Sequence, residues 1–129
     1  MSRRFYITGL AFGMIAVILG AFAAHGLKPL LTAEAMITFE TGVKYQIYHS
    51  LLLLLIGNMR VNPAPVFQWI FYFLIFGIIF FSGSIYLLAT NDLTAIDFKY
   101  LGPVTPVGGS LLIFCWILLL GHFIKLKNK

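Results

Sequence analysis

The sequence predicts an all-α protein, an integral membrane four-helix bundle, from its composition, its apolar runs and the placement of its charges. Hydrophobic residues make up 60% of the 129 positions and charged residues 10%, whereas a soluble domain has about a quarter charged residues. The apolar residues form four long runs with short connections, which is typical of membrane-spanning helices. We therefore expect a single transmembrane domain covering residues 1–129.

The first predicted span covers residues 5–25. Its uncharged run follows Arg3 and Arg4 and is about as long as a helix that crosses the hydrocarbon core. A cleaved signal peptide is the alternative, because Ala21-Phe-Ala23 resembles a cleavage site, but the run is longer than a typical signal-peptide core. Small side chains recur at helical spacing along this span and predict one closely packed face: Gly9, Gly13, Ala16, Gly20 and Ala24.

The second predicted span, residues 43–59, follows an amphipathic segment that we expect to lie in the membrane interface. Thr32 has the residue type of an N-cap for this helix. Residues 33–42 alternate apolar and polar side chains too often to cross a membrane. Glu40 precedes Lys44 by one turn, which is the order that favours an ion pair on a helix. The helix is then expected to continue into the membrane.

The third and fourth predicted spans cover residues 66–89 and 105–124, with a polar loop between them. The third span is rich in aromatic residues, and Phe81-Ser-Gly-Ser84 lies near its end. Thr105 and Pro106 are the residue types preferred at the N-cap and at the first helical position, so we expect the fourth helix to begin there.

The positive-inside rule places both termini in the cytoplasm. Six basic residues then lie on the cytoplasmic side and three on the outer side. The inner set is Arg3, Arg4, Arg60, Lys125, Lys127 and Lys129, and the outer set is Lys28, Lys44 and Lys99. The net charge of +5 is therefore explained by topology and not by a nucleic-acid surface, which requires clustered Lys and Arg.

With this orientation, the polar side chains inside the spans gather toward the outer leaflet. The candidate polar cluster consists of His25, Gln46, His49, Ser82, Ser84, Thr105 and Ser110. Gln46 and His49 share one helical face, which is expected to point into the bundle because hydrocarbon cannot satisfy their donors. Two interpretations stay open: hydrogen bonds that hold the helices together, or a small polar pocket in which His25 or His49 contacts a ligand. A metal site is a weaker third interpretation, since two imidazoles are too few ligands.

The common catalytic signatures are absent from the sequence, including HExxH, a nucleophile elbow, a phosphate loop and CxxC. None of the predicted spans contains Asp or Glu, whereas proton-coupled transporters usually need an intramembrane carboxylate. We therefore expect no catalytic residue, no cofactor and no metal. Close helix packing is expected at six glycines: Gly9, Gly13, Gly20, Gly83, Gly108 and Gly109.

Four segments, in order along nearly the whole chain, resemble the motifs of a known family. They are Gly20-Ala-Phe-Ala-Ala-His-Gly-Leu27, Tyr45-Gln-Ile-Tyr-His49, Phe81-Ser-Gly-Ser-Ile-Tyr86 and Leu101-Gly-Pro-Val-Thr-Pro-Val-Gly-Gly109. They are similar to the small bacterial membrane proteins of domain of unknown function 423, the YgdD/YwdK-like group. The family usually has glycine where this chain has Ala23, which keeps a small side chain. The resemblance implies a four-span membrane protein with an uncleaved first helix and no assigned molecular activity.

We therefore expect a multi-pass protein of the bacterial cytoplasmic (inner) membrane with a structural or accessory role. Its expected partners are the lipid bilayer and either a second copy or another membrane protein, and nucleic acid is not among them. The alternative is a small oligomeric transporter or lipid-handling protein whose pocket is the outer polar cluster. An enzyme acting on a lipid is a third alternative, and it would need a nucleophile or metal beside His25 or His49.

Overall fold

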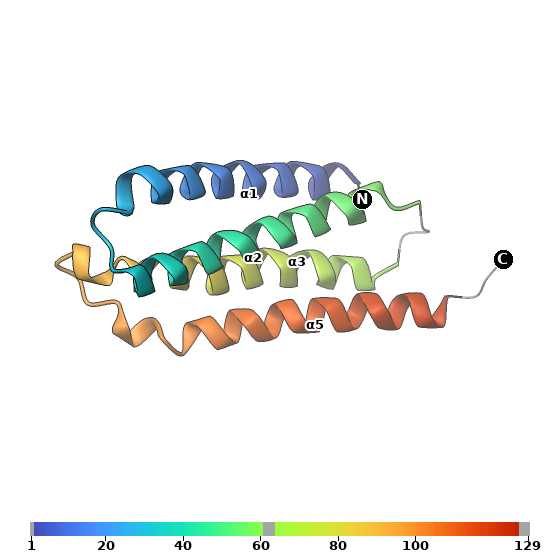
Figure 1. Cartoon of the computed structure of the whole chain (residues 1–129). Coiled ribbons are helices and arrows are strands. Elements are labelled where there is room, and N and C mark those ends of the chain that lie inside the picture. Colours follow the sequence, from blue (N-terminus) through green and yellow to red (C-terminus); the bar gives the residue numbers. More distant parts are fainter. Residues whose placement is uncertain (1, 61–63, 127–129) are drawn as a thin grey trace.

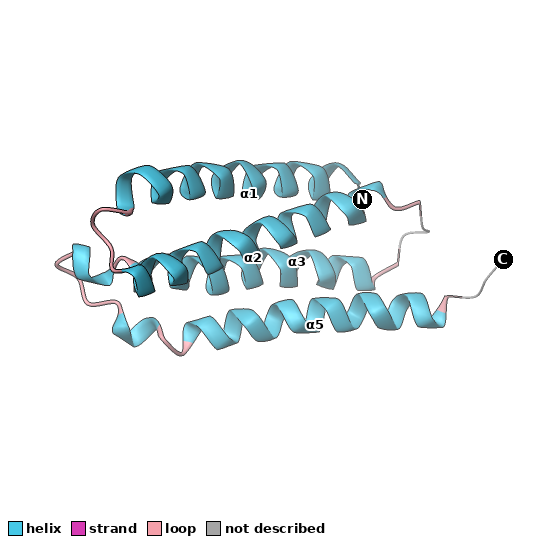
Figure 2. Cartoon of the chain, viewed as in Figure 1, coloured by secondary structure: helices cyan, strands magenta, loops and turns pink. Residues whose placement is uncertain are grey.

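The computed structural model describes residues 2–60 and 64–126, and this part of the chain is helical, with no strand (Figure 2). Helix α1 (Ser2–Phe22) continues without a break into a π-helix, η1 (Ala23–Leu27). After a short turn the chain enters α2 (Ala33–Asn58). Lys127 and Lys129, which the positive-inside rule places in the cytoplasm, lie outside the described residues.

The second half of the chain also contains a π-helix within a longer helical segment. Its elements, in order, are α3 (Val66–Ile78), the π-helix η2 (Ile79–Gly83), α4 (Ser84–Ala89), the short 3-10 turns η3 (Asn91–Leu93) and η4 (Lys99–Leu101), and α5 (Val104–Lys125). We call the end of the molecule that holds η1, α4 and the start of α5 the far end (Figure 1).

Three helical stretches among the described residues are long and apolar enough to cross a membrane: Arg3–Leu27, Val66–Ala89 and Lys99–Lys125. They coincide with the predicted spans 5–25, 66–89 and 105–124. The remaining predicted span, 43–59, belongs to α2, which is one unbroken helix that also includes residues 33–42. It does not join the three because Lys44, Gln46 and His49 interrupt its apolar run.

The predicted helix start at Thr32 is confirmed, whereas the one at Thr105 is wrong. Thr32 has extended backbone, and its Oγ1 accepts a hydrogen bond from the Ala35 N–H at 3.1 Å. Helix α5 begins at Val104 because Pro103 already has helical backbone angles. The Thr105 hydroxyl contacts α4 instead. The ion pair that the spacing of Glu40 and Lys44 favours is also not formed.

The helices are arranged with α1 and α5 at opposite edges (Figure 1). Helix α1 packs along α2, and α5 packs along α3 and η2, while α2 also contacts η2 and α4. Burial agrees with this order: 44% of the most apolar stretch of Val66–Ala89 is buried, against 17% for Arg3–Leu27 and 22% for Lys99–Lys125. The outward faces of α1 and α5 are therefore left to the surroundings.

The interior consists of two apolar clusters and several buried polar side chains. The larger cluster fills the half near the start of α1 and includes Phe5, Leu53, Ile56, Phe67, Leu74 and Cys115. The smaller one lies at the far end and contains Ala23, Leu27, Phe39 and Ala89. The buried polar residues are Gln46, His49, Ser50, Ser82 and Ser84, of which Ser82 and Ser84 lie on η2 and α4 toward the far end.

Candidate functional site

Gln46 connects three helical elements through its side-chain amide. The side chain comes from α2 and is 3% exposed. Its Nε2 donates to the backbone carbonyl of Phe12 in α1 at 2.8 Å, and its Oε1 accepts from the Tyr86 hydroxyl in α4 at 2.7 Å. An amide has two N–H donors and an oxygen with two lone pairs, so each end of the buried side chain makes one bond to a neighbouring helix.

The π-helix η2 lies against α2 at a contact that is both polar and sterically tight. Ser82 Oγ donates to the Gly42 carbonyl of α2 at 2.7 Å, and the pair is buried. A methyl group at Gly42 would lie 2.7 Å from the Tyr86 ring, so only glycine lets this ring rest on the α2 backbone. The Tyr86 hydroxyl thereby reaches Gln46.

Helix α5 joins the same region through a hydroxyl pair and a close backbone approach. Ser84 Oγ lies 2.6 Å from Thr105 Oγ1 and donates to the Phe81 carbonyl at 3.0 Å. Because a serine hydroxyl has one proton, Thr105 is the donor within the pair. One turn later, a methyl group at Gly108 would lie 2.7 Å from the carbonyl carbon of Phe80. Helix α5 therefore rests directly on the η2 backbone.

His49 links α2 to α5. Trp116 Nε1 donates to His49 Nε2 at 3.0 Å, and His49 Nδ1 lies 2.7 Å from the Tyr45 carbonyl. An indole N–H can only donate, so Nε2 is the acceptor and Nδ1 carries the proton that it donates to Tyr45. This geometry describes a neutral imidazole with both nitrogens engaged.

We call the hydrogen-bonded set Gln46, His49, Ser82, Ser84, Tyr86, Thr105 and Trp116 the interhelical polar network. The structure does not bring His25 and Ser110 into it. His25 is exposed, with Nδ1 2.9 Å from the Ala21 carbonyl of its own helix. Ser110 is exposed and donates to the Pro106 carbonyl at 2.8 Å, also within its own helix.

Two network members, Tyr86 and Trp116, were not among the residues selected from the sequence. Tyr86 lies near the end of a span, where tyrosine usually marks the membrane interface. Trp116 lies mid-helix, where packing is the ordinary role. The sequence does indicate a partner for Trp116. An indole N–H away from water needs an acceptor, and the side chains of Gln46 and His49 within the predicted spans can supply one.

Five of the six glycines expected at helix contacts lie close to a neighbouring helix. A methyl group at Gly9 would meet the Ser50 carbonyl at 2.9 Å, and one at Gly13 would meet Ser50 Oγ at 3.4 Å. Gly20 faces Val43 at 3.4 Å, and Gly109 faces the Phe81 ring at 3.5 Å. Gly108 has the tightest contact, against backbone. Gly83 differs, because nothing lies within 4 Å of a methyl group there.

The described residues contain no group of three His, Cys, Asp or Glu side chains placed to hold a metal ion. Of the network, His49 and Trp116 also border a shallow apolar groove of about 300 Å³ between α2 and α5, together with Tyr45, Phe81 and Leu112. Chemically, the network can hold helices in register, because its hydroxyl, amide, imidazole and indole groups bond to neighbouring helices.

Comparison with known proteins identifies the family. The family model described as "Protein of unknown function (DUF423)" matches residues 19–109. The chain belongs to this family. The UPF0382 membrane protein SSP2132 of Staphylococcus saprophyticus is 43% identical over 117 residues, covering 91% of this chain and 93% of the relative. The UPF0382 inner membrane protein YgdD of Escherichia coli K12 is 40% identical over 131 residues, covering 100% of this chain and 96% of the relative.

These matches agree with the three apolar helices, and the chain is a multi-pass membrane protein of unassigned molecular activity. No solved structure matches the DUF423 chain. Both π-helices fall inside the matched region; η1 lies within the motif segment Gly20–Leu27, and η2 overlaps the start of Phe81–Tyr86. A π-helix inserted into an α-helix often marks a functional or specially packed position. Here η2 supplies the backbone on which α5 rests.

Proposed function

We propose that this DUF423 member is a non-enzymatic accessory protein of the bacterial inner membrane that acts by packing with a second copy or with another membrane protein. The observation that carries the proposal is the double engagement of Gln46. Because the Gln46 side chain is 3% exposed, a ligand from outside cannot reach the N–H and the lone pair that these two bonds leave unused. Gln46 donates from Nε2 to the Phe12 carbonyl of α1 and accepts at Oε1 from the Tyr86 hydroxyl of α4. The polar network is therefore assigned to assembly of the helices.

The same proposal includes four membrane spans with both termini in the cytoplasm. Helix α2 supplies the fourth span: its residues 43–58 extend about 24 Å at 1.5 Å per residue, short of the ~30 Å hydrocarbon core, so the side chains of Lys44 and Arg60 would extend to the two membrane surfaces. Its interior polar groups, Gln46 and His49, are satisfied within the protein. Residues 33–42 carry Glu34 and Glu40 and would lie in the outer interface. The bias of six inner against three outer basic residues sets the direction.

The surfaces available for packing are the outward faces of α1 and α5. Large apolar side chains are exposed along both edges, among them Leu10 (61%), Met14 (61%), Ile113 (61%) and Leu120 (63%). Lipid covers such faces, and so does the helix of another membrane protein. Because the two edges are opposite (Figure 1), one copy can contact two neighbours at once.

Cysteine cross-linking in native membranes tests this role. Cys115 is buried and would first be replaced by alanine. Single changes Leu10→Cys and Leu120→Cys then probe the two edges, and Leu53→Cys, buried at 0% exposure, is the matched control. A discrete cross-linked species from at least one edge, with none from the control, is expected. A protein that stays monomeric and uncross-linked from both edges would contradict the packing role.

The topology needs its own experiment. Membrane-impermeant thiol labelling of intact cells is expected to modify Lys99→Cys in the outer loop and to leave Arg60→Cys unlabelled until the cells are opened. Both positions are exposed in the structure. The opposite pattern would reverse the proposed orientation while leaving the packing role intact.

A further inference from the structure

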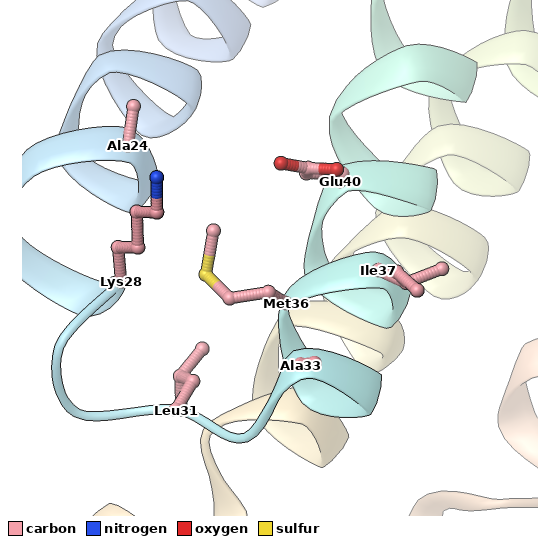
Figure 3. A pocket seen from close by; sticks show the side chains of 7 residues that line it. All are labelled: Ala24, Lys28, Leu31, Ala33, Met36, Ile37 and Glu40. Carbon is pink, nitrogen blue, oxygen red and sulfur yellow. The ribbon is translucent and has the colours of Figure 1, made fainter.

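A groove of about 480 Å³ lies between the end of η1 and the first turns of α2, at the far end of the molecule (Figure 3). This volume is within the ~300–1,000 Å³ range of small-molecule sites. The small side chains of Ala24 and Ala33 leave space for the groove, and Leu31 and Met36 supply apolar surface inside it. The groove shares no residue with the interhelical polar network.

The two walls of the groove carry opposite charges. Lys28 ends the η1 segment, and Glu40 lies on the second turn of α2; Figure 3 shows the ammonium and the carboxylate directed into the groove from either side, with Met36 between them. Both residues are exposed, and no ion pair joins them within the described part of the chain. Glu40 is also not paired with Lys44. The groove therefore presents one cationic and one anionic group, each open to an outside partner.

The position of the groove restricts that partner. With the four spans proposed above, this end of α1 and α2 would lie at a membrane surface, whichever side it faces, and lipid headgroups would surround the groove. A lysine ammonium binds phosphate as a compact point charge, and a carboxylate accepts hydrogen bonds from a primary ammonium. An anionic headgroup satisfies Lys28 but brings negative charge toward Glu40.

We propose that this groove binds the headgroup of a zwitterionic phospholipid with a primary amine. The phosphate lies against Lys28, the ammonium against Glu40, and the glycerol end along Met36 and the exposed Ile37. Charge complementarity selects this occupant over a second copy of the chain or a free anion. The lipid would then hold the η1 and α2 ends together, since those ends lack a direct ion pair across the groove.

Native mass spectrometry of the full-length protein in mild detergent tests the proposal, with equal amounts of phosphatidylethanolamine and phosphatidylglycerol added. The wild-type protein is expected to bind phosphatidylethanolamine about two- to fivefold better, the range for one exposed ion pair. Glu40→Gln is expected to remove this preference, and Lys28→Gln to weaken binding of both lipids. Glu34→Gln and Lys44→Gln are matched controls, because these exposed α2 residues do not line the groove.

A second arm uses only the wild-type protein, so it does not depend on a variant that folds. Successive N-methylation of phosphatidylethanolamine to phosphatidylcholine removes the N–H donors for Glu40, and binding is expected to fall at each step. Equal binding across the series, a preference for phosphatidylglycerol, or a ratio unchanged in Glu40→Gln would each overturn the proposal. Displacement of the lipid by millimolar inorganic phosphate, or by dimer formation, would assign the groove to that occupant instead.

Discussion

Gly108→Ala gives the sharpest test of the packing between α5 and η2. A methyl group at Gly108 would lie 2.7 Å from the Phe80 carbonyl carbon and 2.8 Å from Phe81 Cα, whereas ordinary contacts begin at 3.4 Å. The Phe81 backbone nitrogen would be closer still. Helix α5 must therefore retreat by about 1 Å, because backbone atoms cannot rotate away as a side chain can. That movement also stretches the Ser84–Thr105 hydrogen bond. Overpacking costs about 1–3 kcal/mol, and we expect about 2–3 kcal/mol here.

The buried thiol of Cys115 provides the assay. Cys115 is the single cysteine of the chain and is 0% exposed, so a maleimide reacts with it only when the helices open. If reclosing is faster than labelling, a loss of 2–3 kcal/mol raises the labelling rate about 30- to 140-fold. Gly121→Ala is the control on the same helix, since nothing lies within 4 Å of a methyl group there. Equal labelling rates in the two variants would refute the packing argument.

Further variants follow from the same contacts, each measured by equilibrium unfolding of the purified protein in mixed micelles. Gln46→Ala is expected to cost about 1–3 kcal/mol because it leaves the Tyr86 hydroxyl without an acceptor. A loss below ~0.5 kcal/mol, the size typical of surface variants, would contradict this. Trp116→Phe removes the donor to His49 Nε2 and should cost about 1 kcal/mol, provided that Trp69→Phe, an exposed control, is neutral. His25→Ala and Ser110→Ala should each stay within ~0.5 kcal/mol, since both bond only within their own helices; larger losses would place them in the network after all.

The helical class and most span boundaries follow from the sequence because hydropathy alone determines them. Val66–Ala89 has the predicted limits, and the Thr32 cap is formed as its residue type indicates. The burial of the polar residues against other helices can also be predicted, because a Gln or Ser inside a span must find a partner in the protein. Gln46 and Ser82 accordingly bond to neighbouring helices.

The partners themselves could not be read from the sequence, because they depend on the rotation of each helix about its axis. A π-helix shifts that rotation and has no simple sequence pattern. In η1 it accompanies a His25 side chain that is exposed and bonded to its own helix. In η2 it brings backbone, and not a side chain, against Gly108. The role of Tyr86 was hidden for a different reason, since the same residue near a helix end also suits an interfacial anchor.

The central claim, that the polar network holds the helices together, is tested most directly by a double-mutant cycle between Gln46→Leu and Tyr86→Phe. Unfolding free energies of the wild type, both single variants and the double variant give the coupling between the two side chains. The lost bond from Gln46 to Phe12 is common to both Gln46→Leu arms and cancels. A favourable coupling of about 0.6 kcal/mol, and no more than about 1.7 kcal/mol, is predicted, since these are the average and the maximum for interhelical hydrogen bonds in membranes. A coupling of zero within error would contradict the claim.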